Sequence, residues 1–536
     1  MKTATRTSQD EREAKRSVEA GWELPALTGT AGIARVEEAP SQLLEAVYFD
    51  TPDLRLIRSG ITLRYRQDHR EGAGSGAGAD GEREHGWTLK LPSGAPGVQR
   101  GPTLARQELM WPGDPDSPPP EAVGLIRATL RTASLGPVAR LRTDRRRFRL
   151  LGSAEAGDEL IAEVDDDRVA LTEGPPGVRA LDFREVEVEL APETPEGALE
   201  AIVDCLESAG ASGAVPVPEV LRALGPAALE PPHPAAGVVG ESSTLGEVVS
   251  AFIGEGVTAL LRFDPALRLG GDAENLHQAR VASRRLRSHL RTFRRVLDPG
   301  WLGEAEPDLR WIGRMLGAVR DADVLHAALA REVDTLGPAD AAIAHDLLDR
   351  LTAEREEANR ALLGALDSDA YLALLDRLVG AVATPPLRPG VPGSAAAAKM
   401  LPALVRRPWK RLRRQVAQLG DAPSDEALHE TRKRAKHLRY AAELATPVAG
   451  GQAGRLAKKA KQLQEVLGAQ HDAVVLSAYL RSAAGATGSY EAMIAGELLT
   501  RADAEAARHR PEWPGAWKKV AMKKRRAWLK GAALPQ

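Results

Sequence analysis

The stretch that decides the fold is EREAK, residues 11–15, because it combines a two-residue alternation with charges of both signs. If it is a β-strand, this period sends Glu11, Glu13 and Lys15 to one face, spaced by roughly 7 Å. Two carboxylates and an ammonium on one surface suit a divalent metal bound beside a phosphate chain. Alternating charges also occur on the solvent-exposed faces of helices and edge strands, so the neighbouring segments have to decide between a site and a solvated face.

Short segments with the same period continue to about residue 190, and turn-rich stretches separate them. They are 43–51, 61–67, 85–91, 104–111, 146–151, 158–166 and 183–190. Charged residues alternate in several of them, including Arg64 and Arg66 in one segment and Glu185, Glu187 and Glu189 in another. Strands of this kind predict an antiparallel sheet closed into a barrel with a polar interior.

Two complementary sets of side chains would share that interior. The candidate metal ligands are carboxylates: Glu11, Glu13, Asp165, Glu185, Glu187 and Glu189. The candidate phosphate binders are cations: Lys15, Arg64, Arg66, Lys90, Arg106, and Arg142 or Arg145. Packed carboxylates repel one another without a metal, and packed cations repel one another without an anion. The sequence therefore predicts a site that binds both ligands together.

The second half of the chain has a helical period. A helical segment at 194–210 and a linker rich in Pro, Gly and Ala at 226–244 lead into it, and a break at 384–398 divides it. Two elements recur across that break: HQARVASRRLR (277–287) with HETRKRAKHLR (429–439), and LGAVRDADVL (316–325) with LGAQHDAVVL (467–476). Two elements that recur in the same order predict a duplicated helical unit, at about 245–383 and 399–530.

Each copy of the repeat carries a basic stripe. At 100° per residue, one helix face collects His277, Arg280, Arg284, Arg287 and Arg291 in the first copy, and His429, Arg432, Lys436 and Arg439 in the second. Like charges one turn apart repel, so an anion should bind there. The alternative is a solvated face neutralised by Asp321, Asp323 and Asp472. Among polyanions, the low aromatic content of 4% favours inorganic polyphosphate over nucleic acid.

The composition bounds the class of protein. A chain of 536 residues predicts two or three domains. Its single cysteine, Cys205, excludes a disulfide framework and a cysteine-based zinc site. No apolar run approaches the ~20 residues that span a bilayer, and the N-terminus has no hydrophobic signal segment. We therefore expect a soluble, cytoplasmic protein with no membrane partner.

The motifs together resemble a known pair of domains. EREAK, YFDT (48–51), LRYR (63–66), WTLK (87–90) and EVEVEL (185–190) resemble the CYTH domain of the triphosphate tunnel metalloenzymes. The two helices that begin with histidine resemble those of the CHAD domain, the conserved-histidine α-helical domain. We expect a tunnel domain over 1–225, a linker over 226–244 and a helical domain over 245–530.

This resemblance implies an α+β multidomain protein, with an antiparallel eight-stranded tunnel followed by two related four-helix bundles. By motif, Glu11, Glu13 and two of the last-strand glutamates take metal positions for Mg²⁺ or Mn²⁺, and Lys15 takes a catalytic position beside them. Arg64, Arg66 and Lys90 take phosphate-binding positions. The same motif pattern implies Arg145 as a further phosphate-binding residue and Asp165 as a further metal ligand. The stretch VPVPEVLRAL (215–224) departs from the family because it has no lysine where many relatives place one that reaches the phosphate chain.

The implied function is metal-dependent hydrolysis of inorganic triphosphate, with polyphosphate bound by the helical domain. Such a protein could associate with polyphosphate granules. Two alternatives stay open: a non-catalytic polyphosphate-binding protein, and a tunnel that acts on an organic triphosphate, as in thiamine triphosphatases and adenylate cyclases.

Overall fold

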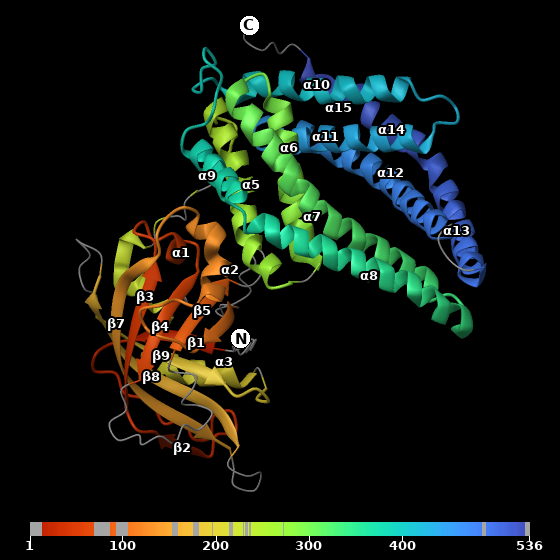
Figure 1. Ribbon diagram of the computed structural model, residues 1–536. Helices are drawn as coiled ribbons and strands as arrows, with labels where there is room; N and C mark the ends of the chain where they lie inside the picture. Colours follow the sequence, from red (N-terminus) through yellow and green to blue (C-terminus); the bar gives the residue numbers. More distant parts are fainter. Residues whose placement is uncertain are drawn as a thin grey trace. The chain divides into compact units, whose positions relative to one another are not determined.

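The computed structural model describes residues 13–530 apart from 69–85, 93–105, 153–158, 175–181, 196, 214–217, 229, 231–233, 235–236, 272 and 485–488. The chain forms two compact units, Met1–His233 and Pro234–Gln536 (Figure 1). Each unit has its own architecture, a β-sheet in the first and helices in the second. No helix in the described part of the chain combines the length and the apolar character needed to cross a membrane.

The first unit is an antiparallel sheet, as predicted. Its strands are β1 (Glu13–Val18), β2 (Arg35–Glu38), β3 (Gln42–Asp50), β4 (Thr62–Asp68), β5 (Gly86–Pro92), β6 (Arg106–Trp111), β7 (Gly136–Leu151), β8 (Leu160–Glu173), β9 (Phe183–Leu190) and β10 (Ser212–Gly213). Four helices accompany them: α1 (Arg55–Arg58), α2 (Pro120–Leu130), α3 (Gly197–Ser208) and α4 (Glu219–Leu224).

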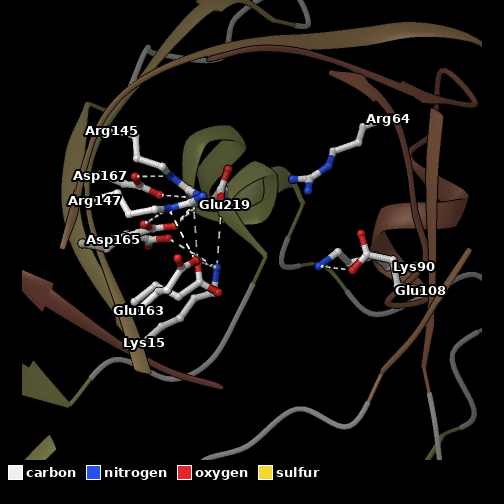
Figure 2. Close-up of polar contacts among 12 residues, drawn as sticks. Lys15, Arg64, Lys90, Glu108, Arg145, Arg147, Glu163, Asp165, Asp167 and Glu219 are labelled. Carbon is white, nitrogen blue, oxygen red and sulfur yellow. Dashed lines mark hydrogen bonds and ion pairs between the residues drawn. The ribbon is translucent and has the colours of Figure 1, made fainter. Parts of the chain in front are cut away.

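The predicted count of eight strands was wrong, because the sheet has ten. The strand order is β10-β1-β9-β8-β7-β3-β4-β5-β6, and β2 pairs with the far end of β7. The two additional strands, β2 and β10, are four and two residues long, too short to carry a recognisable alternation. Between the described residues, pairing does not return from β6 to β1, and the sheet curves around its polar face (Figure 2).

The two faces of the sheet differ in chemistry because successive side chains point to opposite sides. On one face, Val164, Val186 and Val188 pack against Ile202 and Leu206 of α3 in a buried apolar cluster. On the other face, Lys15 of β1 is opposite Glu187 of β9, which is opposite Asp165 of β8. Burial of the apolar face therefore fixes which charged residues face inward.

The second unit is helical throughout its described residues, apart from turns and two isolated β-bridges. Its α-helices are α5 (Leu245–Arg268), α6 (Ala273–Phe293), α7 (Pro299–Val333), α8 (Pro338–Leu366), α9 (Asp369–Ala383), α10 (Ala397–Ala417), α11 (Asp425–Ala449), α12 (Gly451–Ala484), α13 (Ser489–His509), α14 (Trp513–Ala521) and α15 (Lys523–Arg526). The repeated segments lie in α6 and α7 for the first copy, and in α11 and α12 for the second. Both basic stripes are therefore helical, in agreement with the sequence period.

Candidate functional site

Charged side chains face one another across the interior of the curved sheet. Figure 2 shows a dense group on one wall, which includes Lys15, Arg145, Asp165 and Asp167, with Glu219 of α4 between the walls. Arg64 of β4 and the pair Lys90–Glu108 of β5 and β6 point toward this group from the opposite wall. Strands far apart in the sequence thus contribute to one polar interior.

Lys15 lies at the centre of the acidic wall. Its Nζ is 2.9 Å from Glu187 and 3.8 Å from both Glu185 and Glu219. Burial alone would lower the pKa of Lys15, but these carboxylates together with Glu13 raise it well above its ordinary value. The ammonium is therefore held in its charged form by acids from β1, β9 and α4.

Arg145 of β7 is the second buried cation of this wall. It donates two hydrogen bonds to Asp167, from Nε at 2.8 Å and from Nη2 at 2.6 Å, and also pairs with Asp165. Arg147 holds Asp165 from the other side, with its Nε 2.8 Å away. Of the two arginines left open by the sequence, Arg145 lies in the interior, whereas Arg142 is exposed and lies 3.9 Å from Asp144.

The pKa values of the acidic residues are shifted in opposite directions. Burial and repulsion from Glu187 raise the pKa of Glu13 well above its usual range. Burial also raises the pKa of Asp167 to about 6 and that of Glu185 to about 7. Burial would raise the pKa of Glu187 too, but attraction to Lys15 and Arg145 holds it well below the ordinary value. Attraction to the cations of the site therefore outweighs burial at Glu187 but not at Glu13, Asp167 or Glu185.

On the opposite wall, the buried Nε atoms of two arginines have no hydrogen-bond partner among the described residues, whereas Lys90 is paired. Arg64 donates from Nη1 to the Tyr48 hydroxyl at 3.3 Å, but the buried Nε atoms of Arg64 and Arg66 have no hydrogen-bond partner. Burial and the adjacent Arg64 lower the pKa of Arg66. Lys90 lies 3.0 Å from Glu108. A buried guanidinium without a partner is costly, so this wall favours an anion.

Two interior residues of α4, Glu219 and Arg222, were not among the site residues predicted from the sequence. Glu219 is 7% exposed, and the attraction of Lys15, Arg66, Arg64 and Arg145 overcomes the effect of burial and lowers its pKa to about 2. Arg222 pairs with Glu185 and donates to the Ser17 hydroxyl at 3.1 Å. Both lie in the stretch singled out for its missing lysine, where their charges were the available signal.

Three acidic residues could hold a metal ion. Asp167, Glu187 and Glu219 each offer an oxygen, and these oxygens lie within 4.8 Å of one another. The buried Oε2 of Glu219 and Oε1 of Glu185 accept no hydrogen bond. Clustered carboxylate oxygens are the donors that Mg²⁺ and Mn²⁺ prefer, so the residues fit a hard divalent cation.

The remaining predicted residues are placed as follows. Of the proposed metal ligands, Glu187 belongs to the three-oxygen cluster, whereas Asp165 and Glu189 lie outside it. Asp165 pairs with Arg145 and Arg147, much as Asp167 of the cluster pairs with Arg145, and Glu189 is exposed near the end of β9. Asp167, a member of the cluster, was not predicted. Glu11 and the side chain of Arg106 lie outside the described residues.

The helical unit contains a large basic groove between α6, α7, α11 and α12, with a volume of about 820 Å³. Eight of the nine predicted residues line it: His277, Arg280, Arg284, Arg287, Arg291, His429, Arg432 and Lys436. Arg439 instead donates to Glu443 at 2.6 Å and lies over the Tyr440 ring. The two stripes therefore face a shared hollow.

Acidic residues neutralise only part of this groove. Arg280 lies 2.7 Å from Asp321 and Arg432 lies 3.6 Å from Asp472, as the solvated-face alternative expects. Asp323 pairs with Arg355 and also lies 4.0 Å from Arg320, another residue that lines the groove. Arg284 donates hydrogen bonds of 3.1 and 3.2 Å to the Tyr440 hydroxyl, a neutral group that does not compensate its positive charge.

The pKa values of three ionisable groups in the groove are lowered. Burial and the arginines around it lower the pKa of Lys436 to about 7. Burial, with Arg320 beside His277 and Lys433 beside His429, also lowers the pKa of both histidines. His429 contacts His471, a residue the sequence did not single out, with 3.1 Å between their Nδ1 atoms. Burial is the largest cause of each shift, and the neighbouring cations add to it.

The family models match both units. The CYTH domain model matches residues 10–215, and the CHAD domain model matches residues 251–481. The chain is also 34% identical over 478 residues to Uncharacterized protein Rv2226 of Mycobacterium tuberculosis strain H37Rv, a match that covers 85% of each chain. This chain belongs to the CYTH and CHAD domain families.

Two solved structures resemble it less closely. PptA from Streptomyces chartreusis is 27% identical, with a TM-score of 0.43, and the match covers 52% of this chain and 100% of PptA. The CHAD domain of the plant Ricinus communis is 26% identical, with a TM-score of 0.42, and the match covers 56% of this chain and 97% of that domain. The family assignment rests on the two family models and the mycobacterial relative.

Membership narrows the chemistry of the first unit. The CYTH superfamily comprises triphosphatases and cyclases, and its tunnel enzymes are metal-dependent. The tunnel domain of this CYTH–CHAD protein accordingly has a triphosphate-related function.

The three-oxygen cluster yields a prediction about metal binding. Replacing Glu219 by Gln removes one charged oxygen with little change in size, so Mn²⁺ affinity should fall by about tenfold or more. Isothermal titration with Mn²⁺ in the absence of phosphate measures this. Asp144→Asn, an equal charge change at an exposed position of β7, is the control. Equal Mn²⁺ affinities for Glu219→Gln and the control would contradict the assignment.

Proposed function

We propose that the tunnel domain hydrolyses inorganic triphosphate with Mg²⁺ or Mn²⁺ and that the CHAD domain binds inorganic polyphosphate. The observation that carries the first part is the division of charge between two facing walls. Carboxylates collect around Lys15 and Arg145, and cations with unused donors collect around Arg64. A metal and a phosphate chain complement these walls only when both are bound.

The residues of the cation wall bind and orient the substrate. Arg64, Arg66 and Lys90 meet the phosphate oxygens, and guanidinium groups match phosphate geometry with paired hydrogen bonds. Lys15, at the centre of the acidic wall, adds a charged donor. Because these groups are buried, they neutralise phosphate charge more strongly than exposed cations would.

The residues of the acidic wall hold the metal. Asp167, Glu187 and Glu219 are its ligands, with Glu13 next to Glu187. When bound, the divalent ion supplies Lewis-acid stabilisation of phosphate charge. Lys15 and Arg145 keep the carboxylate of Glu187 ionised and ready to coordinate.

The triphosphatase proposal makes a direct kinetic prediction. The full chain should release phosphate from triphosphate with Mg²⁺ or Mn²⁺, and Glu187→Gln should lower kcat by about 100-fold or more because a buried charged ligand is lost. Arg64→Ala should act mainly through a raised KM. The exposed Arg142→Ala is the matched control. A folded protein that binds Mn²⁺ but releases no phosphate would instead favour the non-catalytic alternative.

The polyphosphate proposal rests on the groove. Arginine and lysine side chains from α6, α7 and α11 face one hollow. Among the described residues, ion pairs with Asp321, Asp323, Glu430 and Asp472 neutralise four of these cations and leave the others. Repulsion among these cations falls when an anion binds, and a repeating phosphate chain can neutralise several at once. The low aromatic content of the chain disfavours base stacking, which argues against nucleic acid as the ligand.

The lowered pKa of Lys436 makes binding depend on pH. A bound polyanion stabilises the ammonium, so binding takes up a proton above the free-state pKa of about 7, which burial and nearby arginines set. Polyphosphate affinity should therefore rise as pH falls from 8.5 to 7, by up to about tenfold per unit. Protonation of His277 and His429 would strengthen binding further at lower pH. Lys436→Arg stays charged and should flatten the profile above pH 7; an unchanged slope would contradict this role.

A further inference from the structure

A second hollow in the helical unit is lined by arginines. It has a volume of about 450 Å³, and its lining includes six of them: Arg291, Arg294, Arg295, Arg388, Arg407 and Arg411. The other lining residues are Thr292, Pro408 and His437, so within the described structure no carboxylate lines it. We call this hollow the arginine basin.

Three separate segments supply the arginines of the basin, and α11 adds His437. Arg291 lies in the last turn of α6, and Arg294 and Arg295 follow that helix directly. The segment before α10 runs beside them, since Leu297 and Leu387 form a β-bridge and the Arg388 amide donates to the Val296 carbonyl at 2.9 Å. Arg407 and Arg411 lie one turn apart on α10 and complete the lining. The fold therefore brings the arginines together from distant parts of the unit.

The charge of the basin is almost uncompensated. Arg294 lies 3.6 Å from Glu306, but the other five arginines form no ion pair with any described residue. Burial and the neighbouring Arg295 lower the pKa of Arg407, and burial with Arg291 lowers that of Arg411. Mutual repulsion of this kind is relieved by a polyvalent anion, and guanidinium groups favour phosphate oxygens.

The basin and the groove share part of their walls. Arg291 and His437 line both, and they also line a third hollow of about 320 Å³ that includes Arg411, Lys433 and Arg434. The buried His437 contacts the Thr292 hydroxyl at 3.1 Å, and burial lowers its pKa to about 3, so it is uncharged near neutral pH. Arg291 is thus the cation that both hollows have in common.

We propose that the arginine basin is a second polyphosphate-binding site that continues the groove, so that one long chain occupies both. The proposal rests on the polyphosphate binding proposed for the groove. Short chains fill the groove alone, whereas long chains extend past Arg291 and gain contacts with Arg407 and Arg411. Chain-length preference is then a property of the basin.

The test compares two probes, long-chain polyphosphate and a short chain of about ten phosphates, since added contacts raise the avidity of the long chain only. Affinities are measured on the full chain in EDTA, which keeps divalent metal out of the tunnel. Arg407→Gln/Arg411→Gln should weaken long-chain binding by about tenfold and leave short-chain affinity unchanged. The slope of log affinity against log salt concentration for the long chain should fall by an amount that corresponds to about one to two phosphate contacts. Lys399→Gln/Lys410→Gln, at exposed positions of the same helix outside the basin lining, is the matched control.

A groove variant, Arg284→Gln/Lys436→Gln, separates the two proposals. If it weakens both probes and the basin variant weakens only the long chain, both proposals are supported. If the groove variant weakens the binding of both probes and the basin variant weakens the binding of neither, only the basin proposal fails. If neither variant changes the affinity for either probe, the polyphosphate binding proposed for the groove fails as well. A basin variant that loses affinity for a single-stranded oligonucleotide but not for polyphosphate would also overturn the proposal. The single change Arg411→Gln, at an exposed position, guards against misfolding of the double variant.

Discussion

The polar interior of the tunnel domain depends on the charge of Lys15. Its ammonium lies near Glu187, Glu185 and Glu219, and no other cation among the described residues forms ion pairs with all three. Antiparallel pairing of β1 with β9 sets this position, because it aligns Lys15 with Glu187. Without that charge, the acids of β9 and α4 would repel one another in a buried space, and α4 would lose one of its polar links to the sheet.

The residues of α4 extend this charge balance. Glu219 brings a negative charge toward Lys15, Arg64 and Arg66, while Arg222 brings a positive charge to Glu185. The helix therefore supplies one charge of each sign. An acid next to these cations opposes an anion unless a metal is also present, so in the proposed function Glu219 would link substrate binding to metal binding.

Much of this arrangement could be read from the sequence, and the exceptions have physical causes. The bounds of β9 were predicted correctly, because valines alternate with glutamates over 186–189 and one face had to be buried. Asp167 could not be chosen from the run Asp165–Asp167, because three consecutive acids do not show which of them faces the interior of the sheet. In the fold, Asp167 faces Arg145 inside, whereas Asp166 binds Arg184 through hydrogen bonds of 2.7 and 2.8 Å. Glu219 depends on a six-residue helix placed by burial of Val220 and Leu224, which is a tertiary effect.

The two units handle buried and crowded charge in opposite ways. The acidic wall of the tunnel compensates part of its charge internally, through pairs such as Arg145 with Asp167. The groove and the arginine basin leave most of their cations unpaired at the surface of a helical scaffold that apolar packing stabilises independently. Ligand binding should therefore replace existing ion pairs in the tunnel, where geometry and metal decide selectivity. In the helical unit it adds new ion pairs, so ionic strength and chain length govern affinity there.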